Sequence, residues 1–397
     1  MKLAIDSRRK FLQQALALGV TSSISATKAT DAPRLACEPY LQDPRPDAMT
    51  IQWICERPSY SWVEFGTTEQ LGQKAHRVTH GLVDSYNRIN QITLEDLRAG
   101  TTYYYRVFSR EIREFKPYQL TYGDTAQSRL YRFTTPVQQP TQVRALILND
   151  IHDRPESFGE LLKLDTQPGR DFVFLNGDIF DYQTDEQQLI DHLLKPATEH
   201  FASQTPFYYV RGNHETRGKF RREWFDYFRN PEGKPYFDWT WGPVHFIALD
   251  TGEDKPDAEP VYAGLVDFDA YREEQARWLE RVMQGPAFKK AVFRVVLMHI
   301  PPQYSGDWHG ATHVKQLFSP LFDRYKIDVT ISGHTHTYGV HLPMKGQHSY
   351  PVVIGGGPKA SNRTLIQLQA DAKNLSIRLI RDDGQEVGTY TKTAIKK

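Results

Sequence analysis

The chain has 397 residues, of which 39% are hydrophobic and 24% charged, so it is long enough for two domains with buried cores and is not mostly disordered. Its formal net charge of +1 gives no electrostatic reason to expect nucleic acid or an anionic membrane as the partner. Two cysteines exclude a disulfide-dense scaffold and a thiolate-based zinc module, and no apolar run approaches the roughly 20 residues of a membrane span.

The first 29 residues are typical of an export signal. Residues 7–12, SRRKFL, form a twin-arginine pattern, and a short apolar stretch followed by small residues continues as far as Ala29. We therefore predict a signal peptide over residues 1–29, recognition by the twin-arginine export machinery, and a periplasmic or secreted mature protein. This route carries folded proteins, which suits a protein that takes up metal before export. The alternative is a frayed basic N-terminus with an accidental Arg-Arg pair.

From about Leu35 to Pro136 the sequence predicts short strands separated by turn residues. The segment MTIQWIC alternates apolar and polar residues, and WVEFG, RINQITLEDL, TTYYYRVFS and SRLYRFTTP follow at intervals that suit a β-sandwich. Cys37 and Cys55 flank a turn at residues 43–47, so a hairpin there brings them nearly opposite each other. An exported protein tolerates a disulfide, and this spacing favours a structural one, with two free thiols as the alternative.

The N-terminal strands resemble two known kinds of domain. NQITLEDLRAGTTYYYRV resembles the hairpin of a fibronectin type III domain, whereas EPYLQDPRPDAMTIQW and YRFTTP resemble the N-terminal domain of purple acid phosphatases. We assign residues 34–136 to a fibronectin type III-like, purple acid phosphatase-like domain. It shows no clustered histidines or carboxylates, so we expect no chemistry from it.

After the polar linker VQQPT the pattern changes to continuous apolar runs that alternate with helical patterns. The runs include VRALILND, DFVFLNGD, PFYYVRGNHE, VHFIALD, AVFRVVLMHIP and IDVTISGHTH, and the helical patterns are SFGELLKL, DEQQLIDHLLKPATEHF, DAYREEQARWLERVMQ and HVKQLFSPLFDRY. This alternation predicts an α/β core over residues 142–397. The tail returns to strands with a turn at residues 382–384, and we expect it to close a second sheet.

Polar side chains follow five of the apolar runs, at the point where each strand ends. The five clusters are Asp150-x-His152, Gly177-Asp178-x-x-Asp181, Gly212-Asn213-His214-Glu215, His299 and Gly333-His334-x-His336. Because ligands bind beyond the carboxyl ends of parallel strands, we expect these side chains to gather at one edge. Crowded carboxylates and imidazoles repel and lose water there, and divalent metal ions are the natural compensation.

Taken singly, each of these motifs is weak. A second Asp-x-His occurs at residues 307–309, and a lone histidine such as His299 after a strand is more often a hydrogen-bonded core residue. His334 and His336 are a stronger indication of a metal site, since side chains two residues apart in an extended segment point the same way. The ordered combination of all five clusters at strand ends therefore carries the inference.

The ordered set resembles the pattern of the calcineurin-like metallophosphoesterase superfamily, over about residues 142–397. The resemblance implies a two-sheet α/β/β/α sandwich that holds two metal ions. The nitrogen and oxygen donors suit Fe, Mn or Zn and do not choose among them. By position, one ion takes Asp150, His152 and His336, the other takes Asn213, His299 and His334, and Asp178 bridges them.

The resemblance also implies the reaction. Two ions about 3.5–4 Å apart share a water and make a bridging hydroxide available, which attacks phosphorus in line with the leaving group. His214 is assigned to proton donation toward the leaving oxygen or to charge stabilisation in the transition state. Glu215 is expected to orient that imidazole, with a surface carboxylate as its alternative, and Asp181 is given a similar supporting part.

Two motifs depart from the purple acid phosphatases. That family has Asp without the His in the first motif and Tyr three residues after the bridging Asp. This chain has His152 and Asp181 at those places, and Tyr182 lies one residue too late. We therefore expect no iron–tyrosinate colour.

We predict an exported dinuclear phosphoesterase that hydrolyses phosphate monoesters, with diesters of nucleotide or phospholipid type as the close alternative. A non-catalytic binding or scaffold protein with a vestigial metal site is the alternative of another class, and the complete ligand set counts against it. Beyond the export machinery, the expected partner is a small phosphate ester, with no nucleic-acid scaffold role and no membrane span in the mature chain. Trp308, His309 and His313 are candidates for substrate contact. Residues 355–358 (GGGP) predict a tight turn, and close approach of their backbone to the site is the alternative.

Overall fold

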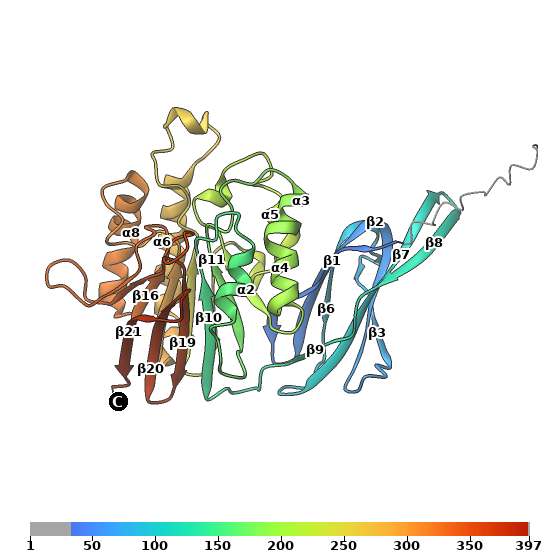
Figure 1. The fold of residues 1–397 in the computed structure, drawn as a ribbon, viewed down its shortest axis with the longest axis horizontal. Coiled ribbons are helices and arrows are strands. Elements are labelled where there is room, and N and C mark those ends of the chain that lie inside the picture. Colours follow the sequence, from blue (N-terminus) through green and yellow to red (C-terminus); the bar gives the residue numbers. More distant parts are fainter. Residues whose placement is uncertain (1–32, 396–397) are drawn as a thin grey trace, which may run out of the picture.

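The computed structural model describes residues 33–395. The predicted export signal at residues 1–29 lies outside the described residues. Figure 1 shows a unit of strands on one side of the molecule and a larger α/β unit on the other. Within residues 33–395, no helix combines the length and the apolar character that crossing a membrane requires.

The elements of the N-terminal unit are strands, as the alternating pattern predicts. The long strand β2 (Ala48–Gly66) serves two layers: its first half pairs with β1 and β6, and its second half pairs with β3 and β7. Trp53 is buried between the layers, where its Nε1 donates to Ser109 Oγ at 2.9 Å. The remaining strands are β1 (Leu35–Arg45), β3 (Gln73–Ala75), β4 (Val78–Thr79), β5 (Leu82–Val83), β6 (Ser85–Leu94), β7 (Thr102–Lys116), β8 (Gln119–Gln127) and β9 (Tyr131–Thr134).

The disulfide expected between Cys37 and Cys55 is not formed, because both are free, buried thiols. The register of β1 and β2 places Cys37 opposite Ile54, one residue short of Cys55. Neighbouring residues of a strand point to opposite faces of the sheet. Cys55 accordingly packs in the core between the two layers, whereas Cys37 packs against the α/β unit.

Two sheets pack face to face in the α/β unit, and helices cover their outer faces (Figure 1). The first sheet has the order β12-β11-β10-β19-β20-β21 and the second has the order β13-β14-β15-β16-β18-β17. The two-sheet α/β/β/α architecture is thereby confirmed. The tail strands differ from the expectation in one respect, because β19–β21 continue the first sheet beside β10 instead of closing the second.

The parallel strands form one side of the first sheet, out to the edge strand β12, whereas in the second sheet they form the centre between antiparallel edge strands. In the first sheet β10, β11 and β12 are parallel, and in the second β14, β15, β16 and β18 are parallel. The first sheet contains β10 (Gln142–Leu148), β11 (Phe172–Asn176), β12 (Phe207–Val210), β19 (Thr364–Asp371), β20 (Asn374–Arg381) and β21 (Glu386–Thr393). The second contains β13 (Phe237–Trp241), β14 (Val244–Leu249), β15 (Phe293–Met298), β16 (Val329–Ser332), β17 (Gly339–His341) and β18 (Val352–Ile354).

The predicted helices form where the one-sided apolar patterns place them, and they bury those faces against the sheets. On the first sheet lie α2 (Glu156–Leu162), α3 (Glu186–Leu189), α4 (Lys195–Ala197) and α5 (Trp224–Tyr227), with the π-helical turns η1 (Ile190–Leu194) and η2 (Thr198–Ala202). On the second lie α6 (Phe268–Gln284), α7 (Pro286–Lys290) and α8 (His309–Tyr325). Short 3-10 turns are η3 (His214–Thr216), η4 (Pro231–Gly233) and η5 (Pro260–Tyr262).

One apolar cluster contains residues of both units, in addition to the separate core within the N-terminal unit. Tyr40 of β1 packs near Phe207 of β12, with ring centroids 6.0 Å apart, and its hydroxyl donates to the Tyr227 carbonyl at 2.8 Å. Tyr105 of β7 likewise donates to the Ser203 carbonyl at 2.8 Å. Since these contacts are buried, the N-terminal unit covers the helical side of the first sheet and holds it in place.

Candidate metal centre

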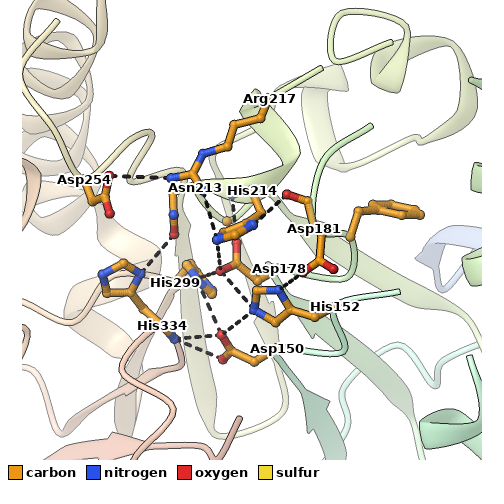
Figure 2. A network of polar contacts seen from close by, with 12 residues as sticks. Asp150, His152, Asp178, Asp181, Asn213, His214, Arg217, Asp254, His299 and His334 are labelled. Carbon is orange, nitrogen blue, oxygen red and sulfur yellow. Dashed lines mark hydrogen bonds and ion pairs between the residues drawn. The ribbon is translucent and has the colours of Figure 1, made fainter. Parts of the chain in front are cut away.

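The predicted donor side chains lie on loops that leave the carboxyl ends of strands from both sheets. Asp150 and His152 follow β10, Asp178 follows β11 and Asn213 follows β12, all in the first sheet. In the second sheet, His299 follows β15, and His334 and His336 follow β16. Because the sheets pack face to face, these loops meet at one edge of the sandwich, as Figure 2 shows.

Several of these residues have a left-handed backbone. Asp150, His152, Asp178, His334 and His336 have φ between 50° and 70°. Asp and His enter this region more readily than most residues with side chains. Such conformations persist only where the surrounding structure fixes them, and they are concentrated at functional sites.

Two glycines of the motifs allow carboxylates to lie directly on the backbone. A Cβ at Gly212 would lie 2.2 Å from Asp178 Oδ1, and a Cβ at Gly333 would lie 2.2 Å from Asp150 Oδ2. Amides that follow within two residues of each glycine hold the same carboxylates: the His214 amide donates to Asp178 Oδ1 at 2.9 Å, and the His334 amide donates to Asp150 Oδ2 at 3.0 Å. The glycine of each motif therefore serves to fix the carboxylate of another strand.

A first group of donors consists of Asp150, His152, Asp178 and His336, whose ligand atoms lie within 4.8 Å of one another. Nε2 of His152 is 3.0 Å from Nε2 of His336, and the latter is 3.2 Å from Asp150 Oδ1. Two ring nitrogens at this distance repel each other unless a proton or a common cation lies between them.

A second group consists of Asp178, His299 and His334, and it shares Asp178 with the first. Nε2 of His299 lies 2.9 Å from Asp178 Oδ2, yet it is buried and makes no hydrogen bond. Asn213 Oδ1 lies 2.9 Å from His334 Nδ1, so the amide joins this group. A buried nitrogen that makes no hydrogen bond, beside nitrogen and oxygen donors, fits a transition-metal ion.

In both His152 and His299, Nδ1 lies beside an oxygen that can only accept a hydrogen bond. His152 Nδ1 donates to Asp181 Oδ1 at 2.7 Å, and His299 Nδ1 donates to the Asn176 carbonyl at 2.8 Å. Each ring therefore carries hydrogen on Nδ1 and directs Nε2 toward the donor groups. Such outer contacts orient metal-binding histidines in proteins.

His214 lies beside the first group and is held by two different residues. Its Nδ1 donates to the Asp181 carbonyl at 2.7 Å, and its Nε2 accepts from Arg217 Nη1 at 3.0 Å (Figure 2). Arg217 in turn pairs with Glu253 at 2.9 Å and lies 3.6 Å from Asp254. Asp181 thus orients His152 through its carboxylate and His214 through its backbone.

The prediction that Glu215 orients the His214 imidazole is wrong, because its carboxylate has other partners. Its fully buried carboxylate accepts from the amides of Asp178, Ile179 and Gly212 at 2.6–2.8 Å and from the Tyr209 hydroxyl at 2.8 Å. It is therefore neither a surface group nor the group that orients His214. Instead it ties the loop that carries Asp178 to the loop that carries Asn213.

Sequence reasoning missed other residues of the site. Arg217 was not predicted because arginine is absent from the expected pattern. Glu253 and Asp254 were not predicted either, although the apolar run that forms β14 also ends in polar residues. The predicted turn at residues 355–358 lies against the site, since Asn149 Nδ2 donates both to the Gly356 carbonyl at 3.0 Å and to Asp150 Oδ2 at 2.5 Å.

The charges of the cluster shift its pKa values strongly. Burial opposes charge on Asp150 and Asp178, but the charge of His299, together with hydrogen bonds and charges of the neighbouring imidazoles, outweighs it and lowers the pKa of both carboxyls far below the usual range. Burial also opposes protonation of His152 and His299, yet these carboxylates raise the pKa of His152 to about 9 and that of His299 to about 10. Burial and the charge of His299 lower the pKa of His334 to about 4. Protons on two imidazoles thus balance the carboxylates in the metal-free protein.

A cavity of about 590 Å³ opens beside the two donor groups. Among the residues that line it are Asp178, His214, His336, Lys255 and Trp308. Its size suits a small organic molecule. Trp308, one of the candidates for substrate contact, therefore lies at the cavity, whereas His309 and His313 are not among its lining residues and contact Asp269.

Known proteins match both units. Residues 143–338 match the family model for calcineurin-like phosphoesterases, and residues 38–135 match that for the purple acid phosphatase N-terminal domain. Purple acid phosphatase 22 of Arabidopsis thaliana is 26% identical over 309 residues, which cover 74% of this chain and 64% of that protein. A probable glycerophosphodiester phosphodiesterase, GpdQ, of Arcobacter nitrofigilis is 25% identical over 214 residues, which cover 52% of this chain and 69% of that protein.

Solved structures agree on the fold. Purple acid phosphatase PPD1 from yellow lupin (Lupinus luteus) seeds superposes with a TM-score of 0.65 at 17% identity, covering 91% of this chain and 74% of that one. The match to the Arabidopsis relative spans less than two thirds of its length. The chain thus carries a domain of the calcineurin-like phosphoesterase family behind an N-terminal domain of the purple acid phosphatase type.

Proposed function

We propose that this protein is a dinuclear metal-dependent phosphoesterase that hydrolyses phosphate monoesters. The observation that carries the proposal is the position of Asp178, which belongs to both donor groups at the floor of the cavity. The proposed ligands are Asp150, His152 and His336 for one ion, Asn213, His299 and His334 for the other, and Asp178 between them. When bound, iron, manganese or zinc ions at these positions supply a hydroxide nucleophile and neutralise phosphoryl oxygens.

His214 acts on the side of the leaving group through Nε2. Its Nδ1 hydrogen is committed to the Asp181 carbonyl, so a proton for a leaving oxygen comes only from the doubly protonated ring, in which a hydrogen on Nε2 replaces the contact from Arg217. Arg217 Nη1 lies 3.0 Å from that nitrogen and lines the same cavity. The pair therefore places one proton donor and one fixed positive charge where negative charge grows in the transition state.

The charge of the cavity wall favours monoesters. A phosphate monoester carries about two negative charges at neutral pH, and a diester carries only one. Arg217 and Lys255 both line the cavity, where Asp254 offsets part of their charge, and the sites for two cations add positive charge. Diester hydrolysis is the second candidate, because a relative that covers half of this chain is named as a probable glycerophosphodiester phosphodiesterase.

The remaining parts of the proposal concern processing and domain limits. The twin-arginine pattern at residues 7–12 supports export and removal of residues 1–29. Residues 34–136 are proposed as a fibronectin type III-like domain and residues 142–397 as the metallophosphoesterase domain, with the linker VQQPT between them.

One experiment tests the function directly. The exported protein is analysed for bound metals, and hydrolysis of an aryl phosphate monoester and of the matching diester is measured on the same sample. We expect two ions per chain and a higher kcat/KM for the monoester. A higher value for the diester would transfer the assignment to phosphodiesterases. A protein without bound metal that cleaves neither ester would contradict the proposal.

A further inference from the structure

A second cluster of metal-binding side chains lies outside the candidate metal centre, between α6 and α8. Asp269 belongs to the first turn of α6, and His309 and His313 belong to the beginning of α8. One ligand atom from each of the three lies within 4.8 Å of the others. The histidines are four residues apart, which places both on the same face of the helix.

The distances within this cluster are close to those around a zinc ion. His309 Nε2 lies 2.8 and 2.9 Å from the two carboxylate oxygens of Asp269, and His313 Nδ1 lies 3.1 Å from Asp269 Oδ1. Two donors about 2.0–2.1 Å from a tetrahedral zinc are about 3.3 Å apart. The side chains therefore need to separate by only a few tenths of an ångström to admit an ion.

Both histidines lie within ion-pair distance of Asp269, but hydrogen bonding accounts for His309 and not for His313. His309 Nε2 donates to Asp269, whereas His313 Nδ1 is buried and makes no hydrogen bond. A buried polar atom that makes no hydrogen bond destabilises the fold unless another group satisfies it. We propose that Asp269, His309 and His313 bind a zinc ion, at a site separate from the dinuclear centre.

The surroundings of the cluster set the character of this zinc site. Arg272 Nη1 lies 2.9 Å from Asp269 Oδ1, so Oδ2 is the oxygen that remains for the ion. The side chains of His309 and Asp269 are 37% and 39% exposed, which leaves the fourth position to water. The neighbouring positive charge and the open position make this site weaker than a closed site with four protein ligands.

Zinc at this site joins two helices beside the wall of the cavity. Trp308, which lines the cavity, immediately precedes α8, and the Gly310 amide donates to the Asp254 carbonyl at 2.8 Å. Asp254 lies 3.6 Å from Arg217. A zinc ion that joins the first turn of α8 to α6 therefore stabilises the segment that carries Trp308. The zinc site itself stands independently of the proposed hydrolysis.

The test is zinc binding by the full-length protein, measured by equilibrium dialysis with metal analysis. His309→Ala and His313→Ala each remove one ligand and leave the Asp269–Arg272 pair intact. We expect the unaltered protein to bind one more zinc per chain than either variant. We expect the affinity at this third site to fall more than about 100-fold, since even outer contacts of a metal site are worth about 10–100-fold. His76→Ala, which removes an exposed histidine of the N-terminal unit, is the matched control and should bind as the unaltered protein does.

The dinuclear centre and the third site are separable in this experiment. If the dinuclear centre binds no zinc, the total falls equally in all four proteins and the difference of one ion remains. Thermal unfolding without zinc checks that each variant folds, and added zinc should raise the Tm of the unaltered protein more than that of either variant. Equal stoichiometry, equal affinity and equal Tm rise in the unaltered protein and a folded variant would overturn the proposal.

Discussion

The two units of the chain are both built on buried strands, but their strands end differently. In the N-terminal unit β1 runs directly into β2 and β7 into β8, so the strand ends are used by tight hairpins. In the α/β unit β10, β11 and β15 have parallel neighbours, which require long crossovers. Each crossover begins with a loop that is free to carry Asp150, Asp178 or His299. Strand direction, more than composition, therefore decides which unit can carry a reactive site.

The largest effect is expected in a crossover loop of the α/β unit, at Asp178, because this residue belongs to both donor groups. Asp178→Asn keeps the size of the side chain but removes the charge shared by both donor groups. Because two bound ions would together supply the nucleophile and neutralise the phosphoryl oxygens, we expect turnover to fall by more than about 10⁴-fold. Metal analysis should show fewer than two ions per chain. A folded variant with two ions and normal turnover would remove the basis for a bridging carboxylate.

His214 separates proton transfer from metal binding. In His214→Ala we expect both ions to be retained and kcat to fall by about 10²–10⁴-fold, the usual worth of a positioned acid or base. The loss should be smaller for aryl esters with good leaving groups than for alkyl esters, because a good leaving group needs little protonation. Metal analysis and kcat for two such esters measure this. An equal loss for both would indicate charge stabilisation in place of proton donation.

Metal loading should release protons from the α/β unit. The raised pKa values of His152, about 9, and His299, about 10, mean that both rings hold a proton at pH 7 in the metal-free protein, which an ion must displace. Apparent affinity should therefore rise with pH, about tenfold per unit for each ring, until pH approaches 9. Calorimetric titration in buffers with different ionisation enthalpies counts the released protons. An affinity that stays constant between pH 6 and 8 would contradict the assignment of these rings as ligands.

The smallest effect is expected at the contact between the two units. Tyr40→Phe removes the hydroxyl that donates to the Tyr227 carbonyl and leaves a buried acceptor without its partner. We expect the free energy of unfolding to fall by about 1–3 kcal/mol, with kcat unchanged. Tyr60→Phe, whose hydroxyl meets His76 at an exposed position, is the control and should change stability by less than about 0.5 kcal/mol. Urea unfolding measures both.

The sequence predicts this fold wherever periodicity is strong. The one-sided pattern around Trp278 and Leu279 gives α6, and the continuous apolar runs give the central strands of both sheets. Periodicity does not say which of two similar sheets a buried strand joins, and this is why the tail was expected in the second sheet. The cysteines were misplaced for a related reason: a shift of one residue in register reverses the face to which a side chain points.

The site was predictable where residue type alone carries the chemistry. Asp150, His152 and Asp178 stand out because imidazoles and carboxylates after strands suggest metals. Glu215 does not, because its partners are backbone amides, which every residue possesses and no pattern of letters displays. The contact between Arg217 and His214 depends on how far a long side chain reaches, and this too is decided only by the folded chain.

The core shared by the two units bears on protein engineering. Cutting the chain at the linker would remove Tyr40 from its contact with Phe207. It would also expose to water the apolar surface of the first sheet and its helices that the N-terminal unit covers. The α/β unit therefore cannot be excised as a soluble fragment without new polar residues on that surface. Replacing the front half by a foreign β-sandwich would likewise require grafting the aromatic residues of β1.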